Sequence, residues 1–395
     1  MKTTSLKNSA LYFYYLGIFF LFITNTKCFA QKDILDKLLK TDSVSKKKKN
    51  IPLYNGNDGP YIINDTLFRV DSRNRLVILP KFNKDSIIVR VDNKDQNEFY
   101  VSLEKKYTIP KTNYDLPKKM VVISDIEGNY EAFAGFLYSN QLIDENHNWM
   151  YGDGHLVLVG DFVDRGKNVT QVLWLIYKLE QQAKKHNGVV HFILGNHEIL
   201  NFNGDYRYNR KKYIKAAQEI SQIKDKKEAL KYMYSVNSEL GKWLTTKNII
   251  EKIGNYIFVH AGLSPKILNY KLSLRDINNL ARIDFRNKNR SKESVVRFLF
   301  NSRGPLWYRG FFTKRPNYKK ITVLELDSIL NYYKSEKIVV GHTFVKKVST
   351  DFNGKIIRTD VRHGNKKFSS KTQGLLIENH KEFIIDANAR KELLK

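Results

Sequence analysis

Cysteine is almost absent from this chain of 395 residues, in which Cys28 is the only one. A single cysteine cannot form a disulfide within the chain, so covalent cross-links are excluded as a source of stability. The hydrophobic fraction of 42% and the chain length are instead sufficient for a large buried core.

Acidic residues are also scarce, because 40 Asp and Glu stand against 68 Lys and Arg, for a formal charge of +28. An anionic partner such as nucleic acid is one interpretation of this excess. However, Lys is abundant throughout together with Asn, Tyr, Ile and Phe, as in proteins from AT-rich genomes. The one dense basic run, residues 46–49, falls in an expected linker. We therefore expect no specific nucleic-acid partner.

The apolar run near the start of the chain is shorter than a typical membrane-spanning helix. The apolar residues 11–23 follow Lys2 and Lys7 and have the length of a signal-peptide core. Cys28 and Ala30 are small residues three and one positions before an expected cut that leaves Gln31 as the new terminus. We expect residues 1–30 to be removed and the protein to be exported, to the periplasm or beyond, without a stable membrane span. An uncleaved anchor is the alternative.

The remaining chain changes character twice. Residues 31–60 are polar and predict a linker, whereas residues 61–110 predict a small antiparallel β module. Its four expected strands, separated by turn-forming residues, are 68–70, 76–79, 87–91 and 99–103. Residues 119–390 are the expected catalytic domain. Its predicted helices are 131–142, 169–179, 273–282 and 321–333, with a helical insertion at 205–250.

Five short apolar runs in residues 119–390 each lead into a polar residue suited to metal binding or acid–base chemistry. The runs are 120–124, 156–160, 191–195, 256–259 and 337–341, and the residues that follow them are Asp125, Asp161, Asn196 with His197, His260 and His342. Such runs predict strands buried on both faces. Because α/β folds place their sites at the carboxyl ends of strands, the pattern predicts that these side chains gather at one edge.

The segments around these residues resemble the calcineurin-like metallophosphoesterases, specifically the phosphoprotein phosphatase branch. The matching motifs are Ser-Asp-Ile-Glu-Gly-Asn at 124–129, Gly-Asp-Phe-Val-Asp-Arg-Gly at 160–166, Gly-Asn-His-Glu at 195–198, His-Ala-Gly-Leu-Ser-Pro at 260–265 and Gly-His at 341–342. The Trp-containing segment 304–310 is similar to that of bacterial members, including Shewanella-like phosphatases. The resemblance implies an α/β fold of four layers, in which helices cover two β-sheets.

The resemblance also implies a role for each site residue. Two divalent cations would lie about 3.5–4 Å apart and share a hydroxide that attacks phosphorus. Asp161 would bridge the two cations. The other implied ligands are Asp125 and Glu127 for one metal and Asn196, His260 and His342 for the other. His197, held by Asp164, would be the general acid. Arg165 and Arg309 would grip the phosphate oxygens.

One residue departs from the family, which usually has His at position 127, where this chain has Glu. If Glu127 is a substituted ligand, the oxygen-rich site favours Mn²⁺ or Mg²⁺ over Zn²⁺ in at least one position. We expect Mn²⁺ to be the bound metal, and Fe, Zn and Mg are the alternatives. The alternative is a decayed site that binds one metal.

These patterns predict an exported two-metal phosphoesterase that acts on phosphomonoesters. The expected substrate is phosphoserine, phosphothreonine or phosphotyrosine in proteins. A nucleotide such as a dinucleoside polyphosphate is the second hypothesis. A non-catalytic binder of anionic ligands is the third. We expect structural roles for His155 and His191, and also for Glu198 at the end of the Gly-Asn-His-Glu motif. Asp360 cannot be placed from the sequence.

Overall fold

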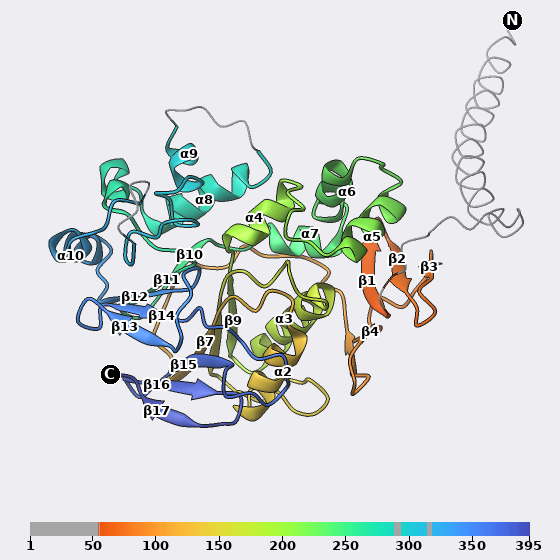
Figure 1. Ribbon diagram of the computed structural model, residues 1–395, viewed down its shortest axis with the longest axis horizontal. Coiled ribbons are helices and arrows are strands. Elements are labelled where there is room, and N and C mark those ends of the chain that lie inside the picture. Colours follow the sequence, from red (N-terminus) through yellow and green to blue (C-terminus); the bar gives the residue numbers. More distant parts are fainter. Residues whose placement is uncertain (1–53, 55, 288–293, 314–317) are drawn as a thin grey trace, which may run out of the picture. The chain divides into compact units, whose positions relative to one another are not determined.

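Two six-stranded sheets form the framework of the computed structural model, which describes residues 54, 56–287, 294–313 and 318–395 (Figure 1). The first sheet has the strand order β17-β16-β15-β7-β8-β9. Its strands are β7 (Lys119–Ile123), β8 (His155–Val159), β9 (Val189–Ile193), β15 (Gln373–Glu378), β16 (Lys381–Asp386) and β17 (Lys391–Leu393). Because β7, β8 and β9 are parallel, their carboxyl ends lie at the same edge.

The second sheet has the order β13-β14-β12-β11-β10-β6. Its strands are β6 (Asn113–Tyr114), β10 (Ile250–Ile253), β11 (Tyr256–Val259), β12 (Lys337–Val340), β13 (Ser349–Asp351) and β14 (Ile356–Arg358). Here β11, β12 and β14 run parallel to one another. All five strands predicted to carry site residues are therefore present, divided between two sheets.

Alternation of side chains along the strands produces the layers. Val157 of β8 and Phe258 and Val339 of the second sheet belong to one buried cluster that joins the inner faces of the two sheets. Neighbouring residues such as Leu158 and Ile257 face the other way, into the cluster that the helices contribute to. Both faces of the strands are thus buried, as their sequences predict.

Helices cover the outer faces, which completes the predicted four-layer α/β fold. The helices of the first sheet are α2 (Tyr130–Ser139) and α3 (Val169–Lys185), and those of the second are α8 (Leu274–Asp284) and α10 (Val323–Tyr332). They correspond to four predicted helices. The first of these was predicted to reach residue 142, but α2 ends at Ser139 because Asn140 caps it and Gln141 adopts a left-handed conformation.

The segment between β9 and β10 is mainly helical. It contains α4 (Asn196–Phe202), α5 (Lys211–Ser221), α6 (Lys226–Met233) and α7 (Glu239–Leu244). The last three form the predicted insertion, which ends earlier than expected because Ile250 already begins β10. Two shorter helices, η2 (Pro265–Tyr270) and α9 (Val295–Leu299), follow β11.

Two small antiparallel sheets precede the large ones. They contain β1 (Asp58–Ile63), β2 (Thr66–Val70) and β3 (Leu76–Leu79) in one sheet, and β4 (Ile87–Arg90) and β5 (Glu98–Val101) in the other. The four predicted strands are confirmed. Strand β1 was not predicted, and it begins within the segment 31–60 that we interpreted as a linker. Its Asp-Gly-Pro start is typical of a turn, but Ile62 and Ile63 are buried.

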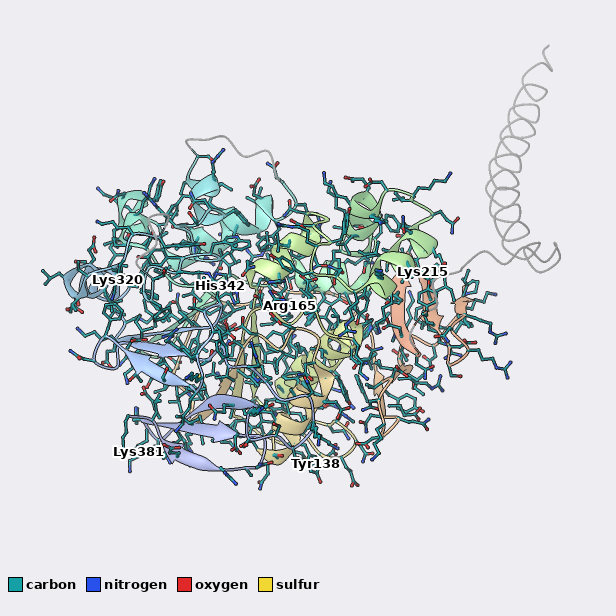
Figure 2. The ribbon with its side chains drawn as sticks, in the orientation of Figure 1. Tyr138, Arg165, Lys215, Lys320, His342 and Lys381 are labelled. Atoms are coloured by element: carbon teal, nitrogen blue, oxygen red, sulfur yellow. The ribbon has the colours of Figure 1, made fainter. Side chains whose placement is uncertain are left out.

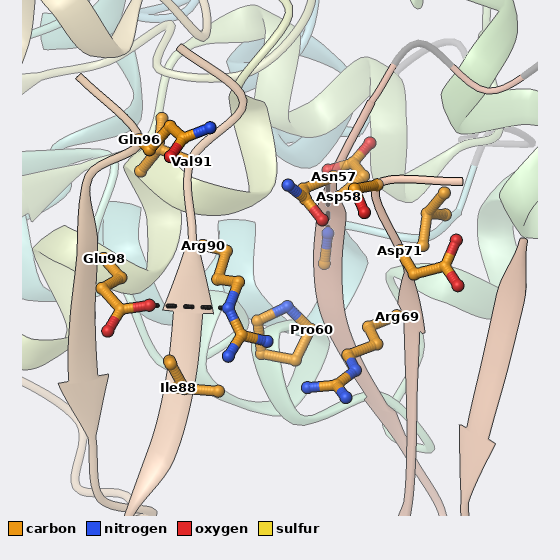
Figure 3. Close-up of a pocket in the computed structure, with 13 residues that line it drawn as sticks. Asn57, Asp58, Pro60, Arg69, Asp71, Ile88, Arg90, Val91, Gln96 and Glu98 are labelled. Carbon is orange, nitrogen blue, oxygen red and sulfur yellow. Dashed lines mark hydrogen bonds and ion pairs between the residues drawn. The ribbon is translucent and has the colours of Figure 1, made fainter. Parts of the chain in front are cut away.

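The small sheets pack on α3, where the Trp174 indole Nε1 donates a hydrogen bond of 2.8 Å to the Pro60 carbonyl oxygen. Arg69 of β2 and Arg90 of β4 project into a cavity of about 340 Å³ between the two sheets (Figure 3). Residues 53–395 form one compact unit. The domain boundaries remain predictions.

The expected signal peptide and most of the expected linker lie outside the described residues. Within the described ranges, no helix is long and apolar enough to cross a membrane.

Candidate metal centre

The carboxyl ends of strands from both large sheets meet at one place, where the predicted ligands lie. Asp161, His260 and His342 each offer a ligand atom, and these atoms lie within 4.8 Å of one another. The three residues follow β8, β11 and β12, so both sheets contribute. All are buried, with exposed fractions of 3%, 0% and 6%. A carboxylate and two imidazoles at this separation form a suitable donor set for a divalent cation.

Asp161 and His260 interact directly. The Nε2 atom of His260 lies 3.1 Å from Asp161 Oδ2 and 3.0 Å from the side-chain oxygen of Asn196. Its Nδ1 lies 2.8 Å from the Val159 carbonyl oxygen, which fixes the ring orientation. Burial alone would lower the pKa of His260, but the Asp161 carboxylate outweighs it, so the pKa is raised. Asn196 is thereby brought to the same centre.

His342 differs because its ring is not satisfied. Its Nε2 is buried and has no hydrogen-bond partner among the described residues. Burial, followed by His260 and Arg309, lowers the pKa of His342, so the imidazole is held neutral. A neutral, unpartnered imidazole nitrogen beside a carboxylate is suited to binding a cation. The residues present therefore fit a metal.

Asp125 lies next to His342. The His342 backbone N–H lies 3.1 Å from Asp125 Oδ2, and Gly341 makes this approach possible because a Cβ there would clash with the carboxylate. Burial, followed by the charges of Asp360 and Asp161, raises the pKa of Asp125. A cation would relieve this repulsion among carboxylates.

Glu127 does not join this group. Its carboxylate forms an ion pair with the Arg165 guanidinium, which is half exposed. Both residues line a cavity of about 700 Å³ above the centre, together with Arg309 and His342. The labelled side chains of Arg165 and His342 can be followed in Figure 2. The structure thus brings Asp161, Asn196, His260 and His342 together and holds Asp125 against the backbone of His342, whereas it pairs Glu127 with Arg165.

The predicted general acid has the expected partner. His197 Nδ1 lies 2.6 Å from Asp164 Oδ2, and the side-chain amides of Asn201 and Asn209 donate to Asp164 Oδ1 at 2.9 and 2.6 Å. The other ring nitrogen, Nε2, is 3.8 Å from Asp161 Oδ2. Burial opposes protonation, but Asp161 and then Asp164 raise the pKa of His197 overall.

The loops around the centre are held by further contacts. Glu198 Oε2 accepts hydrogen bonds from the backbone N–H groups of Asp161 and Gly195, at 3.1 and 2.7 Å. This confirms its predicted structural role. Arg309 Nη1 donates to the His342 carbonyl oxygen at 2.8 Å, which anchors the guanidinium beside the cavity.

Sequence analysis did not place Asp360, although it lines the same cavity. Burial raises the pKa of Asp360 to about 6; His260 lowers this pKa and Asp161 raises it. The signal that could have located it is a sixth apolar run, Ile356 and Ile357 in β14, which ends shortly before Asp360.

Comparison with known proteins agrees with this geometry. The family described as calcineurin-like phosphoesterase matches residues 118–346. Shewanella-like protein phosphatase 1 of Plasmodium berghei (strain Anka) is 34% identical over 245 residues, covering 61% of this chain and 65% of that protein. The chain therefore matches slightly less than two thirds of that relative. Shewanella-like protein phosphatase 2 of Arabidopsis thaliana is 23% identical over 317 residues, covering 71% and 78%.

A solved structure is similar over most of the chain. The cold-active protein-tyrosine phosphatase of a psychrophilic Shewanella species is 32% identical, with a TM-score of 0.75, and the match covers 86% of this chain and 100% of that one. Fold and sequence similarity thus agree. The chain belongs to the calcineurin-like phosphoesterases, a family of metal-dependent phosphoesterases, and within it to the Shewanella-like protein phosphatase branch.

Proposed function

We propose that this protein is a two-metal phosphatase that hydrolyses phosphomonoesters in proteins. The observation that carries the proposal is the convergence of Asp161, His260 and His342 beside the hydrogen-bonded pair His197–Asp164. A binding protein needs a cation-binding centre at most, whereas a hydrolase also needs a proton donor for the leaving oxygen.

The residues that would hold the metals are Asp125, Asp161, Asn196, His260 and His342. Bound divalent cations would polarise the phosphoryl oxygens and make hydroxide available at neutral pH. We propose Mn²⁺ for at least one position, because Asp125 and Asp161 supply hard oxygen ligands.

His197 would supply the proton that the leaving oxygen requires. Asp164 accepts from Nδ1, which leaves Nε2 directed toward the centre. Burial opposes protonation of His197, but Asp161 and Asp164 raise its pKa overall, which favours the protonated ring. Asn201 and Asn209 in turn hold the Asp164 carboxylate in place. This arrangement stabilises the charged ring and fixes its direction.

The arginines would bind the phosphoryl group. Arg165 and Arg309 line the cavity with Arg210 and Arg362, so several guanidinium groups surround the approach to the centre. Guanidinium groups bind phosphate oxygens in a bidentate manner. The cavity of about 700 Å³ is large enough for a phosphorylated side chain with part of its peptide.

The choice of a phosphoprotein substrate is supported by the names of the relatives, which are protein phosphatases, one of them a protein-tyrosine phosphatase. We also propose that the protein is exported before it acts on its substrate, and this rests on residues 1–30 alone. Cell fractionation would test it, because retention of the full-length chain in the cytoplasm would exclude export.

The activity can be tested with p-nitrophenyl phosphate, phosphotyrosine and phosphoserine peptides and a dinucleoside tetraphosphate, each with Mn²⁺, Mg²⁺, Zn²⁺ or Fe²⁺ supplied separately. We expect metal-dependent turnover of the phosphopeptides. Asp161→Asn should reduce turnover by more than roughly 100-fold, since loss of even an outer partner of a metal ligand costs about 10–100-fold. A preference for the dinucleoside would support the nucleotide hypothesis instead. Equal rates for wild type and variant would indicate a contaminating phosphatase.

A further inference from the structure

The segment between α4 and α5 returns to the metal centre and binds the backbone of Arg165. The Arg165 N–H donates a hydrogen bond of 2.9 Å to the Tyr208 carbonyl oxygen, and Arg210 Nε donates one of 2.7 Å to the Arg165 carbonyl oxygen. Arg165 and the preceding Asp164 both have left-handed backbones, with φ angles of 49° and 71°. Such a conformation is unfavourable for these residues and persists where surrounding contacts enforce it. Residues 208–210 supply two of those contacts.

The side chain of Tyr208 lies beside both groups that the reaction would use. Its ring centroid is 4.8 Å from that of the His197 imidazole and 5.2 Å from the guanidinium carbon of Arg165. A guanidinium beside an aromatic ring is attracted by the π electrons of the ring. His197 is 4% exposed and Tyr208 is 38% exposed, so the tyrosine contributes to the burial of the imidazole.

Tyr208 is itself held by its neighbours in the chain. The Arg207 guanidinium lies 5.6 Å from the tyrosine ring and donates hydrogen bonds of 2.8 and 2.9 Å to the Asp205 carboxylate. On the other side, the Asn209 side-chain amide donates a hydrogen bond of 2.6 Å to Asp164 Oδ1. The segment is therefore fixed both before and after Tyr208.

The Arg165 guanidinium has a further partner in Glu127, with which it forms an ion pair. The two side chains are 49% and 26% exposed, and ion pairs in such positions contribute little and restrain long side chains weakly. Tyr208 adds a second contact to the same guanidinium and, unlike this ion pair, also contacts His197.

We infer that Tyr208 is a positioning residue, whose ring holds the Arg165 guanidinium for the phosphoryl group and limits the movement of the His197 ring. The inference rests on the proposed function, in which Arg165 binds phosphate and His197 is the general acid. Groups that are already held close to their productive geometry react faster, because the entropy of ordering them is lost before the reaction begins.

The test compares two tyrosines of the same segment. Tyr208→Leu removes the ring, and Tyr208→Phe keeps it. Tyr206→Leu is the matched control, because Tyr206 is 40% exposed and its ring lies 5.9 Å from the Lys226 ammonium group. Turnover of a phosphoserine peptide and of p-nitrophenyl phosphate, and the affinity for inorganic phosphate from calorimetry, would be measured on the metal-loaded proteins.

We expect Tyr208→Leu to weaken the binding of inorganic phosphate about two- to fivefold, which is the size of an exposed cation–π contact. Turnover of the phosphoserine peptide should fall at least about tenfold. Turnover of p-nitrophenyl phosphate should fall less, because its leaving group needs no proton donor. Tyr208→Phe and Tyr206→Leu should match wild type in all three measurements.

Double-mutant cycles test the two contacts separately. In an Arg165→Ala background, Tyr208→Leu should not weaken phosphate binding further. In a His197→Asn background, Tyr208→Leu should leave the ratio of the two turnover rates unchanged. A further change in either background would overturn the inference, because Tyr208 would then act without Arg165 or His197.

Three other results would also overturn the inference. They are the absence of either effect in Tyr208→Leu, equal losses in Tyr206→Leu, and a loss in Tyr208→Phe as large as that in Tyr208→Leu. Failure of the proposed function has a different signature, namely a wild-type protein that binds phosphate without turning over the phosphopeptide. The phosphate affinities would then still decide whether Tyr208 holds Arg165.

Discussion

Strands β8 and β9 contribute to two buried groups of imidazoles and carboxylates, one near each of their ends. His155 begins β8, and His191 in β9 and Glu251 in β10 lie beside it. His191 Nδ1 is 2.6 Å from Glu251 Oε2, and its Nε2 is 3.0 Å from His155 Nδ1. The metal centre lies beyond the other end of β8, after Asp161. Residue types are similar in the two groups, so residue type alone does not distinguish them.

The two groups differ in how their polar atoms are satisfied. Both ring nitrogens of His191 have partners, and Glu251 Oε1 accepts a hydrogen bond of 2.8 Å from Asn248. At the metal centre, by contrast, His342 Nε2 has no partner among the described residues. A buried polar group that is fully paired supports the fold, whereas an unpaired one is available for a ligand. Substitutions at the metal centre should therefore lower the catalytic rate, whereas substitutions in the group at the other end should lower stability.

The largest effect is expected at the metal centre, where substitution should lower the catalytic rate. His197→Asn should lower kcat on alkyl phosphates on the order of 10²–10⁴-fold, because the leaving oxygen loses its proton donor. The loss should be smaller with p-nitrophenyl phosphate, whose leaving group needs no protonation. Steady-state kinetics on both substrates would measure the difference. An equal loss on both would assign His197 a role other than general acid.

At the opposite end the effect should be on stability. Glu251→Ala removes the acceptor of His191 and one acceptor of Asn248, so we expect the free energy of unfolding to fall by about 3 kcal/mol. Denaturant unfolding of the metal-loaded protein would measure it. Turnover per folded molecule should stay close to that of wild type. A specific loss of turnover with unchanged stability would mean that this group takes part in the reaction.

A smaller effect should appear in the pH dependence of stability. Burial, followed by the charge of His191, lowers the pKa of His155 to about 4, with Asp153 opposing the shift. The unfolded chain takes up a proton at His155 below its ordinary pKa of 6.5, whereas the folded chain does so only near 4. Stability therefore falls as the pH falls through this window.

His155→Asn should flatten this decline, which thermal unfolding at several pH values would show. His147, whose pKa burial also lowers to about 4, remains in both proteins, so only the difference between the two curves reports on His155. Parallel curves would contradict the assignment.

The site was largely predictable because its residues follow strongly apolar strands. Asp161 follows β8, whose five residues are all buried, and such runs are distinctive in sequence. The β15–β16 hairpin was not predicted, because its apolar runs, 375–377 and 383–385, are short. Tertiary burial, rather than local preference, determines those strands.

The partners of individual side chains were the part that sequence could not provide. The motif places Glu127 two residues after Asp125, at a ligand position of the resembling family, yet its carboxylate pairs with Arg165. Asp360 is 235 residues from Asp125 and reaches it only through the pairing of β14 and the contact between Ser124 and Thr359. Neither relationship has a local pattern in the chain.

Several residues of the centre adopt a backbone conformation that favours glycine. The φ angles of Asp125, Asp161 and His342 are 52°, 59° and 61°. For other residues this left-handed region costs roughly 1–2 kcal/mol each. Replacement by glycine would relieve that cost while deleting the side chain that the chemistry requires. A search for heat-resistant variants of this protein should therefore enrich inactive ones at these three positions, and selection must score turnover as well as thermal tolerance.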